Sequence, residues 1–314
     1  MLTAEKIHIQ PATVQQAIDA AYENIEDFTY VAGGTDVFVN KFQGNEISSC
    51  LIDISGIKEL KTVIISGGFL KIGPLVKLKD LKKNEIIRKE FPALIDAAKS
   101  VGTPLIRTAA TIGGNILCEN RCIYYNQSDW WREAIGYCLK CEGDTCIATG
   151  STKKCYSELV SDTAPALISM NAQVEIADKS GITKMELKDI YSGDGVNPRN
   201  IMKTSVITGL LLPLDRKYRV VFKKLRERQS LDFTSLTSAV SVDKDNNIKI
   251  VLAGVDPGPV IVEGPAQTET GKFINEALKK ARSIDNEMMT RIFRREMIKH
   301  FITESINKLK IKHA

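Results

Sequence analysis

Long apolar runs are absent from this sequence of 314 residues. None approaches the roughly 18–20 apolar residues that a membrane-spanning helix needs, and residues 1–10 lack the apolar core of a secretion signal. Strong charge of one sign is also missing, because a net charge of +5 over this length is too weak to indicate a nucleic-acid-binding protein. We therefore expect a cytoplasmic protein that binds neither membranes nor nucleic acids.

What the chain does contain is typical of a globular protein. Hydrophobic residues make up 43% and charged residues 26%, a balance that supports a sizeable core and excludes wholesale disorder. The length predicts two or three packed units. A helix is expected over 13–24 and strands over 51–55, 70–73 and 205–212. Helical spacing also covers 78–81, 86–101 and 268–313, and 218–256 is typical of a strand meander, so we place a boundary near 213–218.

Cysteine has the most unusual distribution. There are seven cysteines, an odd number, and a disulfide framework is improbable in a reducing compartment. Cys50 stands alone, whereas six others share a polar segment with both tryptophans: Cys118, Cys122, Cys138, Cys141, Cys146 and Cys155. A small unit with so little aliphatic core usually needs a metal to fold. The segment therefore predicts an inserted metal-binding element.

The spacing of these cysteines leaves the kind of metal open. Structural zinc prefers paired CxxC motifs, but only Cys138 and Cys141 have that spacing, and the histidines His8, His300 and His313 are remote. A thioredoxin-like redox pair would need a βαβ context that is missing. A cubane iron–sulfur cluster needs four thiolates, and six are available. Spacing alone favours iron–sulfur and zinc equally, with fortuitous cysteines a distant third.

Two glycine pairs are candidates for ligand binding. Gly33-Gly34 follows a strand and precedes Thr35-Asp36, and Gly113-Gly114 stands between Thr111-Ile112 and Asn115. Neither pair matches the GxGxxG or Walker patterns, and a single such pair is more often a plain turn. Two of them, each with polar neighbours, favour a dinucleotide held from two sides, because glycine lets backbone N–H groups approach an anion.

Five segments in a fixed order carry a family resemblance. They are VAGGTDVFV (31–39), RTAATIGGNI (107–116), SDTAPALISMNA (161–172), the K-x3-R-x3-D run from Lys224 to Asp232, and LAGVDPGPV (252–260). The chain resembles the flavin subunit of the molybdenum hydroxylases, the xanthine dehydrogenase and carbon monoxide dehydrogenase family. Most such subunits join GGNI to SD by a short cysteine-free connection, whereas about 45 residues intervene here. That insertion resembles the β subunit of 4-hydroxybenzoyl-CoA reductase, which carries an additional [4Fe–4S] cluster.

The resemblance implies an α+β fold. Residues 1–213 would form a two-lobed FAD-binding domain of the vanillyl-alcohol oxidase class, with lobes at about 1–57 and 58–213 and the cysteine-rich insertion at about 118–158. Residues 218–314 would form a small α+β domain of the carbon monoxide dehydrogenase flavoprotein type. FAD would lie extended between the two lobes.

The resemblance also implies a set of binding residues and no catalytic residue on this chain. The FAD contacts would be Thr29, Tyr30, Val31, Ala32, Gly33, Gly34, Thr35, Asp36, Val101, Thr111, Ile112, Gly113, Gly114, Asn115, Asp162, Ile207 and Lys224. The cluster ligands would be Cys122, Cys138, Cys146 and Cys155. Lys224 would lie beside the flavin and stabilise its anionic reduced form, although a solvated lysine is the more common reading of the residue alone. Residues 72–76 depart from the family pattern, and we assign no contact there.

The implied function is electron transfer within a larger enzyme. A molybdenum-cofactor large subunit and a [2Fe–2S] small subunit would complete a heterotrimer or its dimer. An additional cluster favours a ferredoxin-like donor and the reductive dehydroxylation of 4-hydroxybenzoyl-CoA or a related aryl-CoA. The alternative is oxidative hydroxylation of a purine or other heterocycle with NAD at the flavin. A third hypothesis is a flavin-free, zinc-stabilised assembly scaffold.

Overall fold

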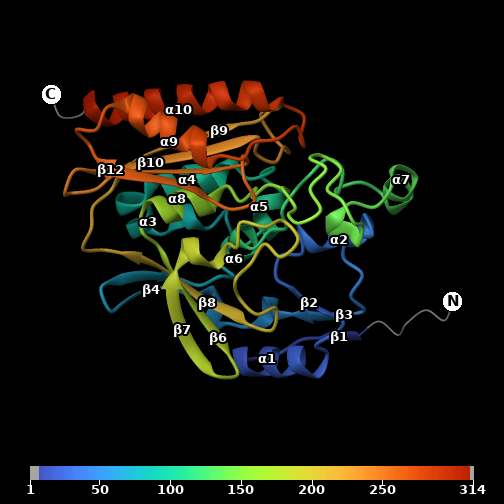
Figure 1. Cartoon of the computed structure of the whole chain (residues 1–314). Helices are drawn as coiled ribbons and strands as arrows, with labels where there is room; N and C mark the ends of the chain where they lie inside the picture. Colours follow the sequence, from blue (N-terminus) through green and yellow to red (C-terminus); the bar gives the residue numbers. More distant parts are fainter. Residues whose placement is uncertain (1–6, 312–314) are drawn as a thin grey trace.

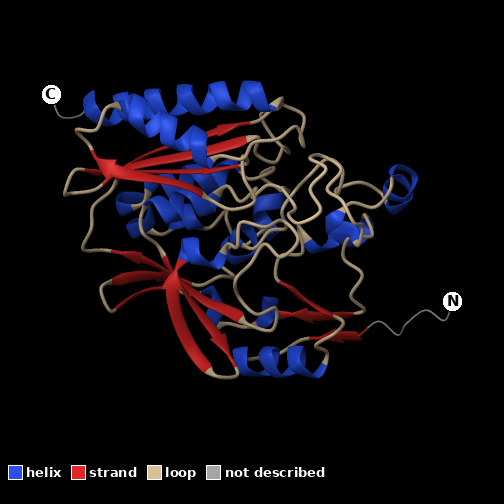
Figure 2. Ribbon diagram, viewed as in Figure 1, coloured by secondary structure: helices blue, strands red, loops and turns tan. Residues whose placement is uncertain are grey.

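The computed structural model describes residues 7–311, so residues 1–6 and 312–314, including His313 and most of the segment inspected for a secretion signal, lie outside the described residues. The described residues form three sheets (Figures 1 and 2). The first is parallel with the order β1-β3-β2. Its strands are β1 (Ile7–Ile9), β2 (Phe28–Val31) and β3 (Cys50–Asp53).

Helix α1 (Val14–Glu23) packs against this first sheet. Its start is fixed by Thr13, whose side chain accepts a hydrogen bond from the backbone N–H of Gln16. The buried side chains Ala17, Ile18 and Ala21 repeat at helical spacing and turn one face to the strands. The helix predicted over 13–24 is confirmed.

The second sheet is antiparallel, with the order β4-β5-β8-β6-β7. Its strands are β4 (Val63–Ser66), β5 (Phe69–Ile72), β6 (Gln173–Asp178), β7 (Gly181–Glu186) and β8 (Val206–Pro213). The third sheet, with the order β12-β11-β10-β9, is also antiparallel. It consists of β9 (Arg219–Leu225), β10 (Leu236–Val242), β11 (Asn247–Ala253) and β12 (Val260–Pro265), as the predicted meander requires.

A helical layer lies between the second and third sheets (Figure 1). It contains α3 (Glu85–Glu90), α4 (Pro92–Ser100) and α8 (Thr163–Ser169). Every residue of α8 is buried, because the helix packs against β10 and β11 as well as α4. On the outer face of the third sheet lie α9 (Thr270–Lys280) and α10 (Arg291–Ile311).

Two predicted helices differ from the structure. The stretch 86–101 is not one helix but α3 followed by α4, because Pro92 has no N–H to continue the first helix and is well suited to begin the second. Residues 78–81 form no α-helix, and a 3-10 turn lies at Leu81–Lys83. The stretch 268–313, in contrast, is largely helical as predicted, and its described part contains α9 and α10 with an irregular segment between them.

The remaining helices are short and surround the loops of interest. They are α2 (Val37–Phe42), α5 (Ile106–Ala109), α6 (Ile112–Ile116) and α7 (Asp129–Ile135), with further 3-10 turns at Ile54–Gly56, Glu59–Lys61, Leu139–Cys141 and Leu187–Ile190. The predicted α+β class is confirmed. Within residues 7–311 we find no helix that combines the length and apolar character needed to cross a membrane.

Candidate functional site

A cavity of about 620 Å³ lies between β2 of the first sheet and β8 of the second. Its walls include the loop after β2, the start of α6, and the segment that leads into β8. The loop after β2 leaves the carboxyl end of a parallel strand, a common place for ligand binding. The volume falls in the range of about 300–1,000 Å³ typical of small-molecule sites.

The first glycine pair shapes the loop that follows β2. A Cβ at Gly33 would lie 2.1 Å from the carbonyl oxygen of Ala109, so only glycine allows this loop to lie against the residues before α6. Gly34 has a φ of +70°, and a Cβ there would lie 2.5 Å from the ring of Phe38. The pair therefore brings the two loops together and permits a left-handed turn.

The second glycine pair begins α6. The Thr111 hydroxyl accepts a hydrogen bond from the Gly114 N–H at 3.1 Å and caps this short helix. A Cβ at Gly113 would lie 2.6 Å from Pro74, so glycine lets this loop lie against the segment after β5. The side-chain oxygen of Asn115 accepts hydrogen bonds from Ser161 and Thr163, and so connects this loop to the start of α8.

Asp162 lies on the cavity wall and forms a buried ion pair with Lys224 of β9. The two charged groups are 2.7 Å apart, and their side chains are 5% and 4% exposed. Burial raises the pKa of the Asp162 carboxyl, although Lys224 acts in the opposite direction. The Lys224 ammonium also donates to the carbonyl oxygens of Ser100 and Asp232. Its contacts join the end of α4 and the start of α8 to β9 of the third sheet.

The structure brings most of the predicted contacts to this cavity. Its wall contains Thr29, Tyr30, Ala32, Gly33, Gly34, Thr35, Asp36, Val101, Thr111, Gly113, Gly114, Asn115, Asp162 and Ile207. Val31 and Ile112 are buried in the surrounding core and, like Lys224, are not among the described residues on the wall. Lys224 instead pairs with Asp162, which does lie on the wall, and its ammonium compensates the charge of that buried carboxylate.

Sequence reasoning missed a large part of this wall. The atypical segment 72–76, to which we assigned no contact, contributes Pro74 and Leu75. Further wall residues come from 197–206 and 231–233. The segment 197–206 has no glycine pair or spaced motif, so no local signal could have identified it. Asp232 does end the K-x3-R-x3-D run, but we assign it no wall contact on the basis of that motif.

The cysteine-rich insertion lies beside the first loop (Figure 1). Asp36 accepts a hydrogen bond from the Glu119 N–H at 2.9 Å and forms an ion pair with Arg121. Helix α7 is held by Arg132, whose guanidinium donates to the carbonyl oxygens of Gln43 and Gln127 and to the side chain of Asn45. The insertion is thus bonded to the loop after β2, which forms part of the cavity wall.

Four cysteines of the insertion line a second, much smaller cavity. They are Cys122, Cys138, Cys146 and Cys155, and its other walls include Leu139, Ile147, Ala148 and Ile284. Cys118 lies instead on the wall of the large cavity, and among the described residues Cys141 lines neither cavity. Cys50 is buried in β3. No three described His, Cys, Asp or Glu side chains converge into a site for a metal ion.

The thiols around this small cavity differ in acidity. A hydrogen bond from Cys141 lowers the pKa of Cys138 to about 6. Burial raises the pKa of Cys122 to about 12 and that of Cys155 in the same direction. Thiolate is the form that binds metal, so binding at this cavity would release protons.

Comparison with known proteins gives a consistent assignment. The family model described as the FAD binding domain in molybdopterin dehydrogenase matches residues 4–215. The aldehyde oxidoreductase FAD-binding subunit PaoB of Escherichia coli (strain K12) is 29% identical over 247 residues, which cover 74% of this chain and 76% of that protein. The xanthine dehydrogenase FAD-binding subunit of Escherichia coli O157:H7 is 23% identical over 271 residues, covering 84% and 79%.

The fold is shared with solved structures as well. Reconstituted CO dehydrogenase from Oligotropha carboxidovorans superposes with a TM-score of 0.77 at 16% identity, over 98% of both chains. The predicted type of fold, that of the carbon monoxide dehydrogenase flavoproteins, is therefore confirmed.

Proposed function

Because the chain belongs to the family of FAD-binding domains in molybdopterin dehydrogenases, we propose that it is the FAD-binding, electron-transfer subunit of a multi-subunit molybdenum enzyme. The observation that carries this proposal is the 620 Å³ cavity between two glycine-pair loops. FAD bound there would supply a group that takes up electrons in pairs and releases them singly. The loops 32–36 and 111–115 would hold it, with backbone N–H groups and hydroxyls suited to its phosphates.

The proposal extends to a [4Fe–4S] cluster at the small cavity. Its support is that the four cysteines Cys122, Cys138, Cys146 and Cys155 line one space, with Lys140 and Ser157 among its otherwise mostly apolar or aromatic walls. A single zinc ion would require all its sulfur ligands about 2.3 Å away, whereas a cubane binds each thiolate to a different iron and suits a wider set. The four thiolates would hold the cluster, which would supply a one-electron centre near the flavin.

We further propose a reductive enzyme that acts on 4-hydroxybenzoyl-CoA or a related aryl-CoA. A flavin alone suffices when NAD exchanges hydride with it, so an extra one-electron centre favours a protein donor of the ferredoxin type. Partner subunits would carry the molybdenum cofactor, a [2Fe–2S] centre and the substrate site, in a cytoplasmic heterotrimer or its dimer.

A second candidate is an oxidative hydroxylase of heterocycles that uses NAD. The observation in its favour is that relatives of this chain carry the names of xanthine and nicotinate dehydrogenases. A flavin-free zinc scaffold, in contrast, would not explain why the chain has a large cavity between two glycine-pair loops.

The first test is cofactor analysis of the purified complex. We expect FAD to be bound without a covalent bond to a His or Cys side chain. Acid precipitation of the protein should then release the flavin into solution. Flavin that stays with the precipitated protein would contradict this. Iron is expected in the wild type and in Cys141→Ser, but much less in Cys138→Ser, three residues away. Zinc without iron would overturn the cluster.

The second test addresses the direction of electron flow. We expect reduced ferredoxin to reduce the complex faster than NADH does. Added salt should slow the ferredoxin reaction if docking is electrostatic, since the chain is net positive and ferredoxins are acidic. Faster reduction by NADH, with no effect of salt on ferredoxin, would favour the hydroxylase.

A further inference from the structure

The two cavities share a wall. Tyr125 lines both the large cavity and the small cysteine cavity, and its side chain is almost fully buried. Glu119 lines the large cavity, and Lys140 lines the small one. The side chains of these two residues form an ion pair, so a charged pair spans the partition between the two spaces.

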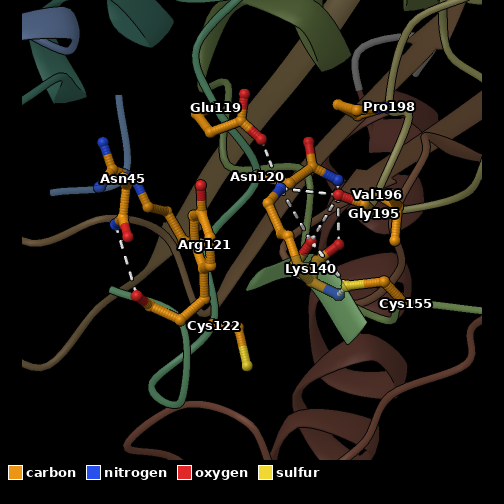
Figure 3. Close-up of polar contacts among 12 residues, drawn as sticks. Asn45, Glu119, Asn120, Arg121, Cys122, Lys140, Cys155, Gly195, Val196 and Pro198 are labelled. Atoms are coloured by element: carbon orange, nitrogen blue, oxygen red, sulfur yellow. Dashed lines mark hydrogen bonds and ion pairs between the residues drawn. The ribbon is translucent and has the colours of Figure 1, made fainter. Parts of the chain in front are cut away.

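Lys140 is held firmly in this partition. Its side chain is only 4% exposed, and its ammonium donates to Glu119, to the carbonyl oxygen of Gly195 at 2.7 Å and to the Ser157 hydroxyl at 3.4 Å (Figure 3). The ammonium also lies 4.8 Å from the centre of the Tyr125 ring. Ser157 in turn contacts the sulfur of Cys155 at 3.4 Å. The cation is therefore fixed close to one of the four thiols.

Glu119 provides a negative charge on the opposite side. Burial acts against ionisation, but the cations Lys140, Arg199 and Arg121 together outweigh it and lower the pKa of Glu119. The carboxylate thus stays charged at neutral pH next to the large cavity.

We propose that Lys140 and Glu119 form an electrostatic pair that sets the redox balance between the two centres, with Lys140 favouring electrons at the cysteine cavity. This inference rests on the proposed function. A cluster held by four thiolates becomes more negative when it gains an electron, and net charge is one of the properties that set its potential. A cation in a buried position is poorly screened by water, so it stabilises the reduced form.

Opposite signs distinguish this role from simple packing. Removing the cation should make the cluster harder to reduce, whereas removing the carboxylate should make it easier to reduce. A loss of packing has no reason to move the potential in opposite directions in the two variants. Lys140 and Glu119 therefore act on the bound centre through their charges, without binding it directly.

The experiment is a redox titration of the intact complex, with the cluster followed by electron paramagnetic resonance and the flavin by absorbance. At the wild-type midpoint, we expect Lys140→Met to raise the ratio of oxidised to reduced cluster about tenfold, which corresponds to about 59 mV for one electron. Glu119→Gln should change the ratio in the reverse direction. Lys140→Arg, which keeps the charge, should stay near the wild type.

Lys154→Met is the matched control, because Lys154 adjoins Cys155 in the sequence but is exposed and should shift the ratio little. If Lys140→Met fails to retain iron, the change in the cluster midpoint potential of Glu119→Gln tests the inference instead. Unchanged midpoints, or shifts of the same sign in both variants, would overturn the inference while leaving the cluster in place. A wild-type complex without iron would overturn the cluster and this inference together.

Discussion

Gly34 combines a left-handed backbone with a position on the cavity wall. We predict that Gly34→Val weakens FAD binding by about tenfold or more, since a left-handed conformation costs a non-glycine residue about 1–2 kcal/mol and the loop would shift to relieve it. Flavin fluorescence titration of the refolded apoprotein measures the change.

The matched control is Gly67→Val in the β4–β5 turn. Gly67 also has a positive φ, +56°, but a Cβ there meets nothing within 4 Å, and the turn is not part of the described cavity wall. This variant carries the same kind of left-handed strain without a clash, and it should bind FAD normally. Equal affinities for the two variants would mean that Gly34 does not shape the site.

The burial of Glu158 leads us to predict that the stability of the protein depends on pH. Burial raises the pKa of Glu158 to about 8, although its partner Arg294 acts in the opposite direction. The folded protein therefore binds a proton that the unfolded chain releases near pH 4.5, so this contribution to stability is complete below about 4.5 and is lost as pH rises through about 8. We expect the urea concentration at the unfolding midpoint to decrease as the pH is raised from 6 to 9. In Glu158→Gln this decrease should be smaller. A wild type whose midpoint rises over this range would refute the assignment.

Helix α7 depends on one long side chain. Its seven residues are too few for a stable isolated helix, and Arg132 fastens it to carbonyl and amide oxygens of the loop after α2. Arg132→Met should cost about 1–3 kcal/mol locally, because those buried acceptors lose their donors. Hydrogen exchange should show faster exchange at 128–137 while the third sheet stays protected. Arg132→Lys should recover part of the protection, since it keeps the charge but loses the planar fork; an unchanged exchange rate in Arg132→Met would contradict this role.

The helical layer lies between the second and third sheets (Figure 1), and the ion pair of Asp162 and Lys224 joins the start of α8 to β9 of the third sheet. Lys224→Met should destabilise the protein by about 3–5 kcal/mol, because it leaves a buried carboxylate uncompensated. The double variant Asp162→Asn with Lys224→Met should recover much of that loss. Thermal unfolding of the single and double variants measures the coupling. Additive losses would show that the two charges do not depend on each other.

The sequence alone was sufficient for features that repeat or are contiguous. Helix α1 and the third-sheet meander follow from side-chain periodicity, which reports the local environment of each element. The two glycine pairs marked the loops of the large cavity because their motifs are short and unbroken. Cysteine spacing alone, in contrast, left zinc and iron–sulfur equal, since spacing does not say which sulfurs face one another.

Only the folded chain brings together groups that are far apart in the sequence. Lys224 meets Asp162 across 62 residues, and Arg132 meets Gln43 across 89. Tyr125 gains its place between two cavities from segments that share no local pattern. Such contacts depend on how sheets and loops pack, and local periodicity carries no information about that packing. Motifs and the family resemblance therefore predicted the class of protein, the loops of its site and four cysteines. Only packing brings these four cysteines around one cavity and places Lys140 and Glu119 beside it.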